Sequence, residues 1–167
     1  MSQRITIIGG GPGGYTAAFS AAKAGAQVTL VEAAHMGGTC LNWGCIPTKT
    51  LKASAEALET AHRLAEFGIA GGGEARPDMP AIVARKNKVS EILRGGLEKT
   101  CAKLKVTLLR GRGEVVSAGL VRVHGADGAV REVAGDKVII ATGSSTLNLP
   151  TLPVDHTHII TSDDALE

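Results

Sequence analysis

The sequence has 167 residues, of which 44% are hydrophobic and 20% are charged, and its formal net charge is +2 at pH 7. A chain of this length and composition can bury one hydrophobic core, so it is a globular domain rather than a disordered tail. Its charges are interspersed, no apolar run reaches the length of a membrane span, and no secretory cleavage pattern follows the apolar start, so we expect a cytoplasmic protein without nucleic acid or membrane partners.

The first thirty residues predict a strand, a tight turn, a helix and a second strand. Ile5 to Ile8 form a β-branched run that ends at Gly9, and the alanine-rich stretch 13–24 has helical character. A second apolar run, Val28 to Val31, then stops at Glu32. Such a βαβ unit places its two strands parallel in one sheet.

The turn between the first strand and the helix, residues 9–14, reads GGGPGG and satisfies the pattern GxGxxG. In such a turn Gly9 permits the sharp bend, Gly11 lets the backbone approach a pyrophosphate, and Gly14 lets helix and strand pack closely. The helix N-terminus attracts phosphate, and Glu32 at the end of the second strand is placed to accept a hydrogen bond from a ribose hydroxyl. The pattern predicts a dinucleotide site without deciding between FAD and NAD, and its alternative is a glycine-rich turn without a ligand.

Residues 37–49 read GGTCLNWGCIPTK and place two cysteines five positions apart. On a regular helix Cys40 and Cys45 would lie about 7.5 Å apart along the axis. A disulfide tolerates a Cα separation of only about 4.4 to 6.8 Å, so a bond between them requires a distorted segment. Gly44 and Pro47 permit such a distortion.

The two cysteines have three interpretations, namely buried inert thiols, half of a zinc site, or a catalytic pair. A zinc site would have to recruit His35 or Cys101, because no second cysteine pair follows at a suitable distance. In the catalytic interpretation Cys45 lies just ahead of a helix N-terminus, where the helix dipole favours a thiolate. Cys101, within a long predicted helix, is most simply a buried apolar residue.

Two helices are predicted after the cysteines. The first runs from roughly Pro47 to Ala65 and has its proline in the first turn. The second follows a glycine-rich loop, is capped by Asp78 and reaches roughly Lys105.

From Val106 onward the pattern changes to short β-type runs, VTLL, GEVV, LVRV, VREV and KVIIAT. They predict a small antiparallel meander that returns to the main sheet. The last run, Lys137 to Thr142, is apolar enough to be a buried strand beside the first, and Gly143 closes it. Residues 148–167 predict an exposed tail in which residues 162–164, Ser-Asp-Asp, can cap a further helix.

Four segments, GGGPGGYTAA, the strand-ending Glu32, GGTCLNWGCIPTK and IIATGS, together resemble the dihydrolipoamide dehydrogenase branch of the pyridine nucleotide-disulfide oxidoreductases. The resemblance spans the whole chain. It implies an α/β fold, a Rossmann-like FAD-binding domain with a parallel central sheet plus a small antiparallel β-meander. It also implies that residues 1–147 are this domain and that residues 148–167 are an exit segment toward an NAD-binding domain.

The resemblance assigns roles to individual residues. Cys40 would exchange with the dithiol substrate, Cys45 would make a charge-transfer contact with the isoalloxazine ring of FAD, and Lys49 would lie near the flavin N5. Gly113 would lie at the adenine end, although a glycine that opens a strand is more often a turn device. Trp43 departs from the smaller aliphatic residue common at its position, and either shapes access for the dithiol or only packs. The residues assigned to cofactor binding are Gly9, Gly11, Pro12, Gly13, Gly14, Glu32, Ala33, Gly38, Thr39, Lys49, Gly113, Ala141, Thr142, Gly143 and Ser144; no metal-binding residue is expected.

The implied reaction passes electrons from a reduced lipoyl dithiol through the two cysteines and FAD to NAD, whose site is not expected within this chain. The implied partners are a lipoyl-bearing acyltransferase or a glycine-cleavage carrier protein, and the complete enzyme is expected to be a homodimer. Members of the family continue with an NAD-binding domain, a second FAD segment and an interface domain. We therefore expect the 167 residues to be an N-terminal portion that is inactive alone and holds FAD weakly. The alternatives are a glutathione or mercuric reductase-like enzyme, or a stand-alone flavin-binding or thiol-redox module.

Overall fold

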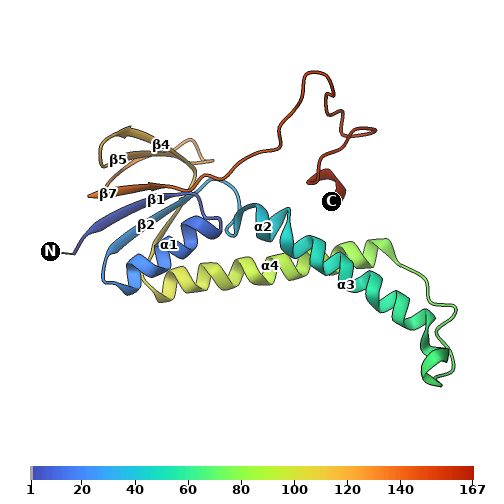
Figure 1. The fold of residues 1–167 in the computed structure, drawn as a ribbon. Coiled ribbons are helices and arrows are strands. Elements are labelled where there is room, and N and C mark those ends of the chain that lie inside the picture. Colours follow the sequence, from blue (N-terminus) through green and yellow to red (C-terminus); the bar gives the residue numbers. More distant parts are fainter. Residues whose placement is uncertain (1) are drawn as a thin grey trace.

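The computed structural model describes residues 2–167. It contains a four-stranded parallel sheet, a three-stranded antiparallel sheet and four α-helices among these residues (Figure 1). In chain order the elements are β1 (Arg4–Ile8), α1 (Pro12–Lys23), β2 (Gln27–Glu32), α2 (Gly38–Asn42), α3 (Cys45–His62), the 3₁₀ turn η1 (Leu64–Phe67), α4 (Met79–Lys103), β3 (Thr107–Arg110), β4 (Arg112–Ser117), β5 (Leu120–His124), β6 (Val130–Ala134), β7 (Lys137–Ile140) and the 3₁₀ turn η2 (Asp164–Leu166). Within residues 2–167 no helix combines the length and the apolar character that crossing a membrane requires.

The parallel sheet has the strand order β3-β2-β1-β7. β1 lies at its centre, with Ile7 opposite Leu30 of β2 on one side and Ile139 of β7 on the other. The second sheet has the order β4-β5-β6 and is antiparallel throughout. The expected α/β class, with a parallel central sheet and a small antiparallel meander, is therefore confirmed.

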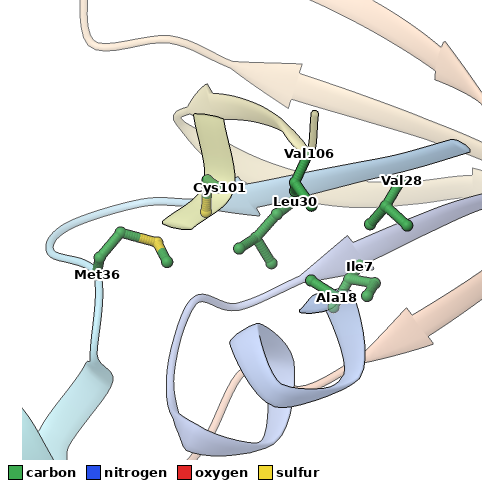
Figure 2. Packing of buried hydrophobic residues seen from close by; sticks show 7 residues of the cluster. All are labelled: Ile7, Ala18, Val28, Leu30, Met36, Cys101 and Val106. Atoms are coloured by element: carbon green, nitrogen blue, oxygen red, sulfur yellow. The ribbon is translucent and has the colours of Figure 1, made fainter. Parts of the chain in front are cut away.

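One face of the parallel sheet is covered by α1 and the C-terminal part of α4. The core on this side contains Ile7, Leu30 and Met36, all completely buried, together with Ala18, Val28, Val106 and Cys101 (Figure 2). Cys101 is 2% exposed and packs in this core from α4, so the prediction of a buried apolar cysteine is confirmed.

The opposite face of the sheet packs against the antiparallel meander. Ile8 and Val31 point to this side, where they form a second core with Val121 and Val123 of β5. Neighbouring residues of β1 thus enter different cores, because side chains alternate along a strand. Both faces are covered, which explains why β1 and β2 direct apolar residues to both sides of the sheet.

The helices begin close to their predicted positions. α3 starts at Cys45 instead of Pro47 and keeps the proline within its first turn, where a missing N–H costs little. Asp78 caps α4 as predicted, because its Oδ1 accepts a hydrogen bond of 3.1 Å from the backbone N–H of Ala81. α3 and the first half of α4 lie side by side and extend beyond the sheet (Figure 1).

The assignment of the run VTLL to the meander was wrong. Thr107 to Arg110 form β3, which pairs in parallel with β2 at the edge of the main sheet. The physical reason is the preceding helix, since α4 acts as the crossover that returns the chain to the start of β2 before β3 begins. The antiparallel meander starts only after Gly111, with β4.

The last strand lies beside β1 as predicted, but the expectation that it is buried was wrong. Ile139 is 36% exposed and Ile140 is 66% exposed. β7 is an edge strand of the four-stranded sheet, so its outer side has no neighbour among the described residues. An apolar sequence alone does not reveal which strand lies at the edge.

The tail from Asn148 is mostly exposed, as expected. The further helix predicted there is only the short turn η2. Its cap is formed by Thr161 and Asp164, and not by Ser162: the Thr161 hydroxyl and backbone N–H both donate to the Asp164 carboxylate, at 2.8 and 2.7 Å. The backbone N–H of Asp164 in turn donates to the Thr161 hydroxyl at 3.3 Å, which completes a reciprocal capping box.

Candidate active site

The glycine loop between β1 and α1 is shaped by close backbone approaches. Gly9 has a φ of +107°, and a Cβ at this position would lie 2.1 Å from the carbonyl oxygen of Ala141. A Cβ on Gly14 would lie 1.7 Å from the carbonyl oxygen of Gly9. Gly14 is therefore required by packing within the loop, and Gly9 by its positive φ and by the approach of the residue that follows β7.

Gly11 is different, because the protein leaves space beside it. A Cβ on Gly11 would contact only the Cα of Gly38, at an ordinary 3.6 Å. Gly11 is also the N-cap of α1, where no side chain caps the helix and no acidic residue occupies the first turn. The N-terminal N–H groups of α1 are thus free to bind an anion, and the open side of Gly11 lets that anion approach.

Glu32, at the end of β2, fastens the glycine loop to the segment that follows β2. Its Oε2 accepts a hydrogen bond from the backbone N–H of Gly10 at 2.6 Å, and its Oε1 accepts one from the N–H of Ala34 at 2.7 Å. A carboxylate offers about four acceptor positions, so two remain for a further donor such as a ribose hydroxyl.

The cysteine segment approaches this loop through a second pair of glycines. Gly37 and Gly38 both have positive φ values, of +98° and +56°. A Cβ on Gly38 would lie 2.7 Å from the Cα of Gly11, so the two backbones are in direct contact there. This approach brings the first turn of α2, which carries Cys40, beside the N-terminus of α1.

The helix breaks between the two cysteines, as their spacing required. α2 ends at Asn42, Gly44 adopts the non-helical dihedrals φ −150° and ψ −111°, and α3 begins at Cys45. Both cysteines are thiols in this structure; Cys40 is half-buried and Cys45 is exposed. The break therefore allows two cysteines five positions apart to meet.

Cys45 perturbs the ionisation of the Cys40 thiol. A hydrogen bond with the Cys45 side chain raises the pKa of the Cys40 thiol above its ordinary value, and partial burial adds to this rise. The positive charge of Lys49 acts in the opposite direction and lowers the pKa of Cys40. Lys49 is thus close enough to influence the thiol pair electrostatically.

A cleft of about 530 Å³ joins the glycine loop to the cysteine segment. Most of the predicted site residues line it. These are Gly9, Gly11, Pro12, Gly13, Glu32, Gly38, Thr39, Cys40, Ala141, Thr142, Gly143 and Ser144. Segments 9–13, 32–43 and 141–144, which are distant in the sequence, therefore meet in one place.

A second pocket of about 390 Å³ shares Gly9, Glu32 and Thr142 with the cleft. It contains two further predicted residues, Ala33 and Gly113. Gly113 also has a packing reason to be glycine, because a Cβ there would lie 2.8 Å from Cγ2 of Ile8. The packing and binding interpretations of this glycine are therefore compatible.

Three predicted residues do not line the cleft or the second pocket. Gly14 is buried beneath the loop, and Cys45 and Lys49 lie on α3, next to Cys40 but outside the lining. The sequence analysis assigned no role in cofactor binding to two others, Arg112 in the second pocket and His35 in the cleft. The His35 and Trp43 rings face each other with their centroids 6.0 Å apart. Trp43, for which the sequence leaves open a role in dithiol access or in packing alone, also lines the cleft, whereas no local pattern indicates His35.

The described residues offer no metal centre at this site. Across residues 2–167, no three side chains of His, Cys, Asp or Glu gather closely enough to hold a metal ion. The arrangement instead suits an elongated anionic cofactor, with a phosphate position at the start of α1, a hydroxyl acceptor at Glu32 and a thiol at the far end.

Comparison with known proteins agrees with this geometry. The family described as pyridine nucleotide-disulphide oxidoreductase matches residues 3–167. The dihydrolipoyl dehydrogenase of Chlorobaculum parvum is 42% identical over 97% of this chain and 34% of its own length. The mitochondrial dihydrolipoyl dehydrogenase 1 of Arabidopsis thaliana is 40% identical over 97% of this chain and 32% of its own length. The chain thus spans about a third of these relatives.

Solved structures show the same architecture. LpdA from Mycobacterium tuberculosis superposes with a TM-score of 0.88 at 29% identity, covering 98% of this chain and 37% of that protein. The flavoprotein disulfide reductase RclA from Escherichia coli, whose production is induced by HOCl, superposes with a TM-score of 0.75 at 32% identity, covering 98% of this chain and 34% of that protein.

Proposed function

We propose, starting from the fact that this chain belongs to the pyridine nucleotide-disulphide oxidoreductase family, that it is the FAD-binding and disulfide-carrying part of a dihydrolipoyl dehydrogenase. One observation carries the proposal: a single cleft is lined both by the glycine loop at the uncapped start of α1 and by Cys40. In this proposal residues 1–147 form the FAD-binding domain, and residues 148–167 lead toward an NAD-binding domain outside this sequence.

The thiol chemistry assigned to this chain is a two-step exchange. In the oxidised protein a disulfide joins Cys40 and Cys45. A deprotonated substrate thiol attacks Sγ of Cys40, which forms a mixed disulfide and releases the Cys45 thiolate. The second substrate thiol, after losing its proton, attacks the substrate sulfur of the mixed disulfide and releases the Cys40 thiolate. The substrate leaves as a disulfide, and its two electrons remain on the cysteine pair.

The other residues bind and orient. FAD, when bound, supplies the two-electron carrier that passes the pair from the cysteines to NAD. The start of α1 and Gly11 would hold its pyrophosphate, and Glu32 would accept a hydrogen bond from its ribose. We assign Cys40 to the substrate side and Cys45 to the flavin side. Lys49, whose charge lowers the pKa of Cys40, would stabilise the thiolates that the exchange produces.

The proposal extends to the setting of the enzyme. The dithiol would be a lipoyl group carried by an acyltransferase or a glycine-cleavage carrier protein, and the complete enzyme would be a cytoplasmic homodimer. The relatives, which are named dihydrolipoyl dehydrogenases, support the lipoyl dithiol. The carrier protein, the dimer and the cytoplasmic location are carried over from the sequence analysis.

The decisive experiment measures lipoamide-dependent formation of NADH by the purified protein of natural length. We expect turnover with dihydrolipoamide that is abolished in both Cys40→Ser and Cys45→Ser, while a Cys101→Ser variant that folds retains it. Glutathione disulfide and Hg(II) are tested as substrates in the reverse direction. Turnover with either of these but not with lipoamide would replace the proposed substrate by that of a glutathione or mercuric reductase. An open reading frame that stops after Glu167 would instead favour a stand-alone flavin or thiol-redox module.

A further inference from the structure

We propose that one face of α4 positions the redox segment and couples it to the exit segment. Two residues on this face of α4 form hydrogen bonds to these segments: Ser90 to α2, and Lys86 to the exit segment. We call this pair of residues the α4 clamp. Both are positioning residues in this proposal, since neither touches the thiols. The inference rests on the proposed redox function of Cys40 and Cys45.

Ser90 holds the backbone immediately beside Cys40. Its hydroxyl donates a hydrogen bond of 3.1 Å to the carbonyl oxygen of Leu41, and the two residues are only 6% and 8% exposed. α2 has five residues, so most of its carbonyl groups lie in its last turn and lack partners within the helix. Ser90 satisfies one of them from a neighbouring helix, away from water, and thereby fixes where α2 lies.

Lys86 binds the exit segment. It is 6% exposed, and its Nζ donates a hydrogen bond to the carbonyl oxygen of Leu166. In the described part of the chain no carboxylate forms an ion pair with Lys86. Burying an ammonium group without hydrogen-bond acceptors is energetically costly. The carbonyl oxygen of Leu166 supplies such an acceptor and so stabilises the buried Lys86 side chain. Figure 1 shows the end of the chain returning toward the helices.

The two halves of the clamp share one pocket. Lys86 and Ser90 are four positions apart and therefore lie on the same face of α4. With Asn42, Trp43 and Leu166 they line a pocket of about 240 Å³. Trp43 also lines the cleft that contains Cys40, so the indole ring forms a wall common to both spaces. A displacement of the exit segment is thus transmitted to the redox segment through a continuous set of contacts.

The first test examines Ser90 in the protein of natural length. The pH profile of Cys40 alkylation is measured by mass spectrometry on the reduced protein. We expect Ser90→Ala to shift this profile toward lower pH. The reason is that a loosened α2 weakens the contact between the two thiols that raises the pKa of Cys40.

We also expect kcat for dithiol oxidation to fall about tenfold in Ser90→Ala while KM for NAD stays unchanged. Ser90→Thr should restore both the alkylation profile and kcat. Ser20→Ala is the control, because Ser20 is exposed on α1. An alkylation profile of Ser90→Ala that matches the control overturns the role of Ser90.

The second test examines the coupling. Amide hydrogen exchange is compared between Lys86→Met and Lys88→Met, since Lys88 is exposed on the same helix. We expect Lys86→Met to accelerate exchange in residues 161–167 and also in residues 37–44, and Lys88→Met to accelerate neither. Acceleration in residues 161–167 alone, or in neither segment, overturns the coupling.

Different results would refute the clamp and the proposed function. A natural-length protein without lipoamide-dependent NADH formation would refute the proposed substrate. The alkylation profile and the exchange rates would still report on the clamp, because they require only the folded chain and its two thiols.

Discussion

The carboxylate of Glu32 accepts a hydrogen bond of 2.6 Å from the backbone N–H of Gly10, and so joins the end of β2 to the glycine loop. The residue that the sequence assigns to a ribose therefore has a structural role in the protein itself. Its other oxygen accepts from Ala34, which shapes the loop that leads to the cysteine segment.

Replacing Glu32 by Gln should weaken both the fold and cofactor binding. A glutamine presents one NH₂ group where the carboxylate has an acceptor, so one of the two backbone N–H groups loses its partner. We expect a loss of about 1 to 3 kcal/mol in the free energy of unfolding, together with weaker FAD binding. Urea denaturation and flavin titration measure the two effects. Glu74→Gln, in an exposed loop, is the matched control, and an equal response of both variants would contradict the structural role of Glu32.

Gly14→Ala should be among the most destabilising substitutions in the chain. Its Cβ would lie 1.7 Å from a backbone oxygen of Gly9, which cannot move without displacing β1 or α1. We expect a loss of about 3 kcal/mol or more in thermal or urea unfolding. Gly96→Ala is the control, since nothing lies within 4 Å of its Cβ position in α4, and it should stabilise by up to about 1 kcal/mol.

Gly11→Ala should separate binding from stability. The substitution fits the protein, because φ at Gly11 is −73° and the nearest atom is 3.6 Å away. We expect the free energy of unfolding to change by less than about 0.5 kcal/mol. The added methyl group occupies the approach to the start of α1, so FAD affinity should fall by at least about tenfold. Unchanged flavin affinity would show that the pyrophosphate does not bind at Gly11.

The thiol pair predicts two pH shifts of opposite sign. Because the pKa of Cys40 is raised chiefly by its hydrogen bond with Cys45, Cys45→Ala should move the midpoint of Cys40 alkylation to lower pH. Because the charge of Lys49 lowers the same pKa, Lys49→Met should move the midpoint to higher pH. Lys52→Met, further along α3 and exposed, should leave it unchanged. Shifts in the same direction for the Cys45 and Lys49 variants would disprove this electrostatic account.

The capping box of the tail predicts a transition in acid. Hydrogen bonds from the backbone N–H and hydroxyl of Thr161, assisted by His156, lower the pKa of Asp164 to about 2. The pKa of an Asp in an unfolded chain is about 3.9, so this stabilisation is complete above that pH and is lost as the pH falls through about 2. The amide NMR signal of Thr161 should report the transition. Asp164→Asn should abolish it, and Asp163→Asn should leave it in place.

The sequence predicted those parts of the molecule whose chemistry is local. The positions of Gly9 and Gly14 follow from the tight turn between a strand and a helix, and that of Glu32 from the end of the second strand; the structure has these elements as predicted. The break at Gly44 followed from the impossibility of joining two cysteines on an uninterrupted helix. The Asp78 cap was likewise readable from its position before a helical run.

The remaining features depend on residues distant in sequence. β3 is a short apolar run like those of the meander, and only the direction in which α4 returns the chain makes it parallel to β2. The exposure of Ile140 depends on which strand ends the sheet. His35 lines the cleft beside Trp43, eight positions later in the chain, and their ring centroids lie 6.0 Å apart. None of these relationships leaves a periodic signal in the sequence.

The open edge of β7 has a practical consequence for work with these 167 residues alone. An edge strand with unpaired backbone groups and exposed isoleucines is a template for pairing with another copy, and it carries only one charged residue, Lys137, to oppose this. Such a polypeptide will therefore be prone to aggregate at high concentration. Flavin titrations on it belong in dilute solution, with light scattering recorded alongside, so that self-association is not mistaken for an inability to bind.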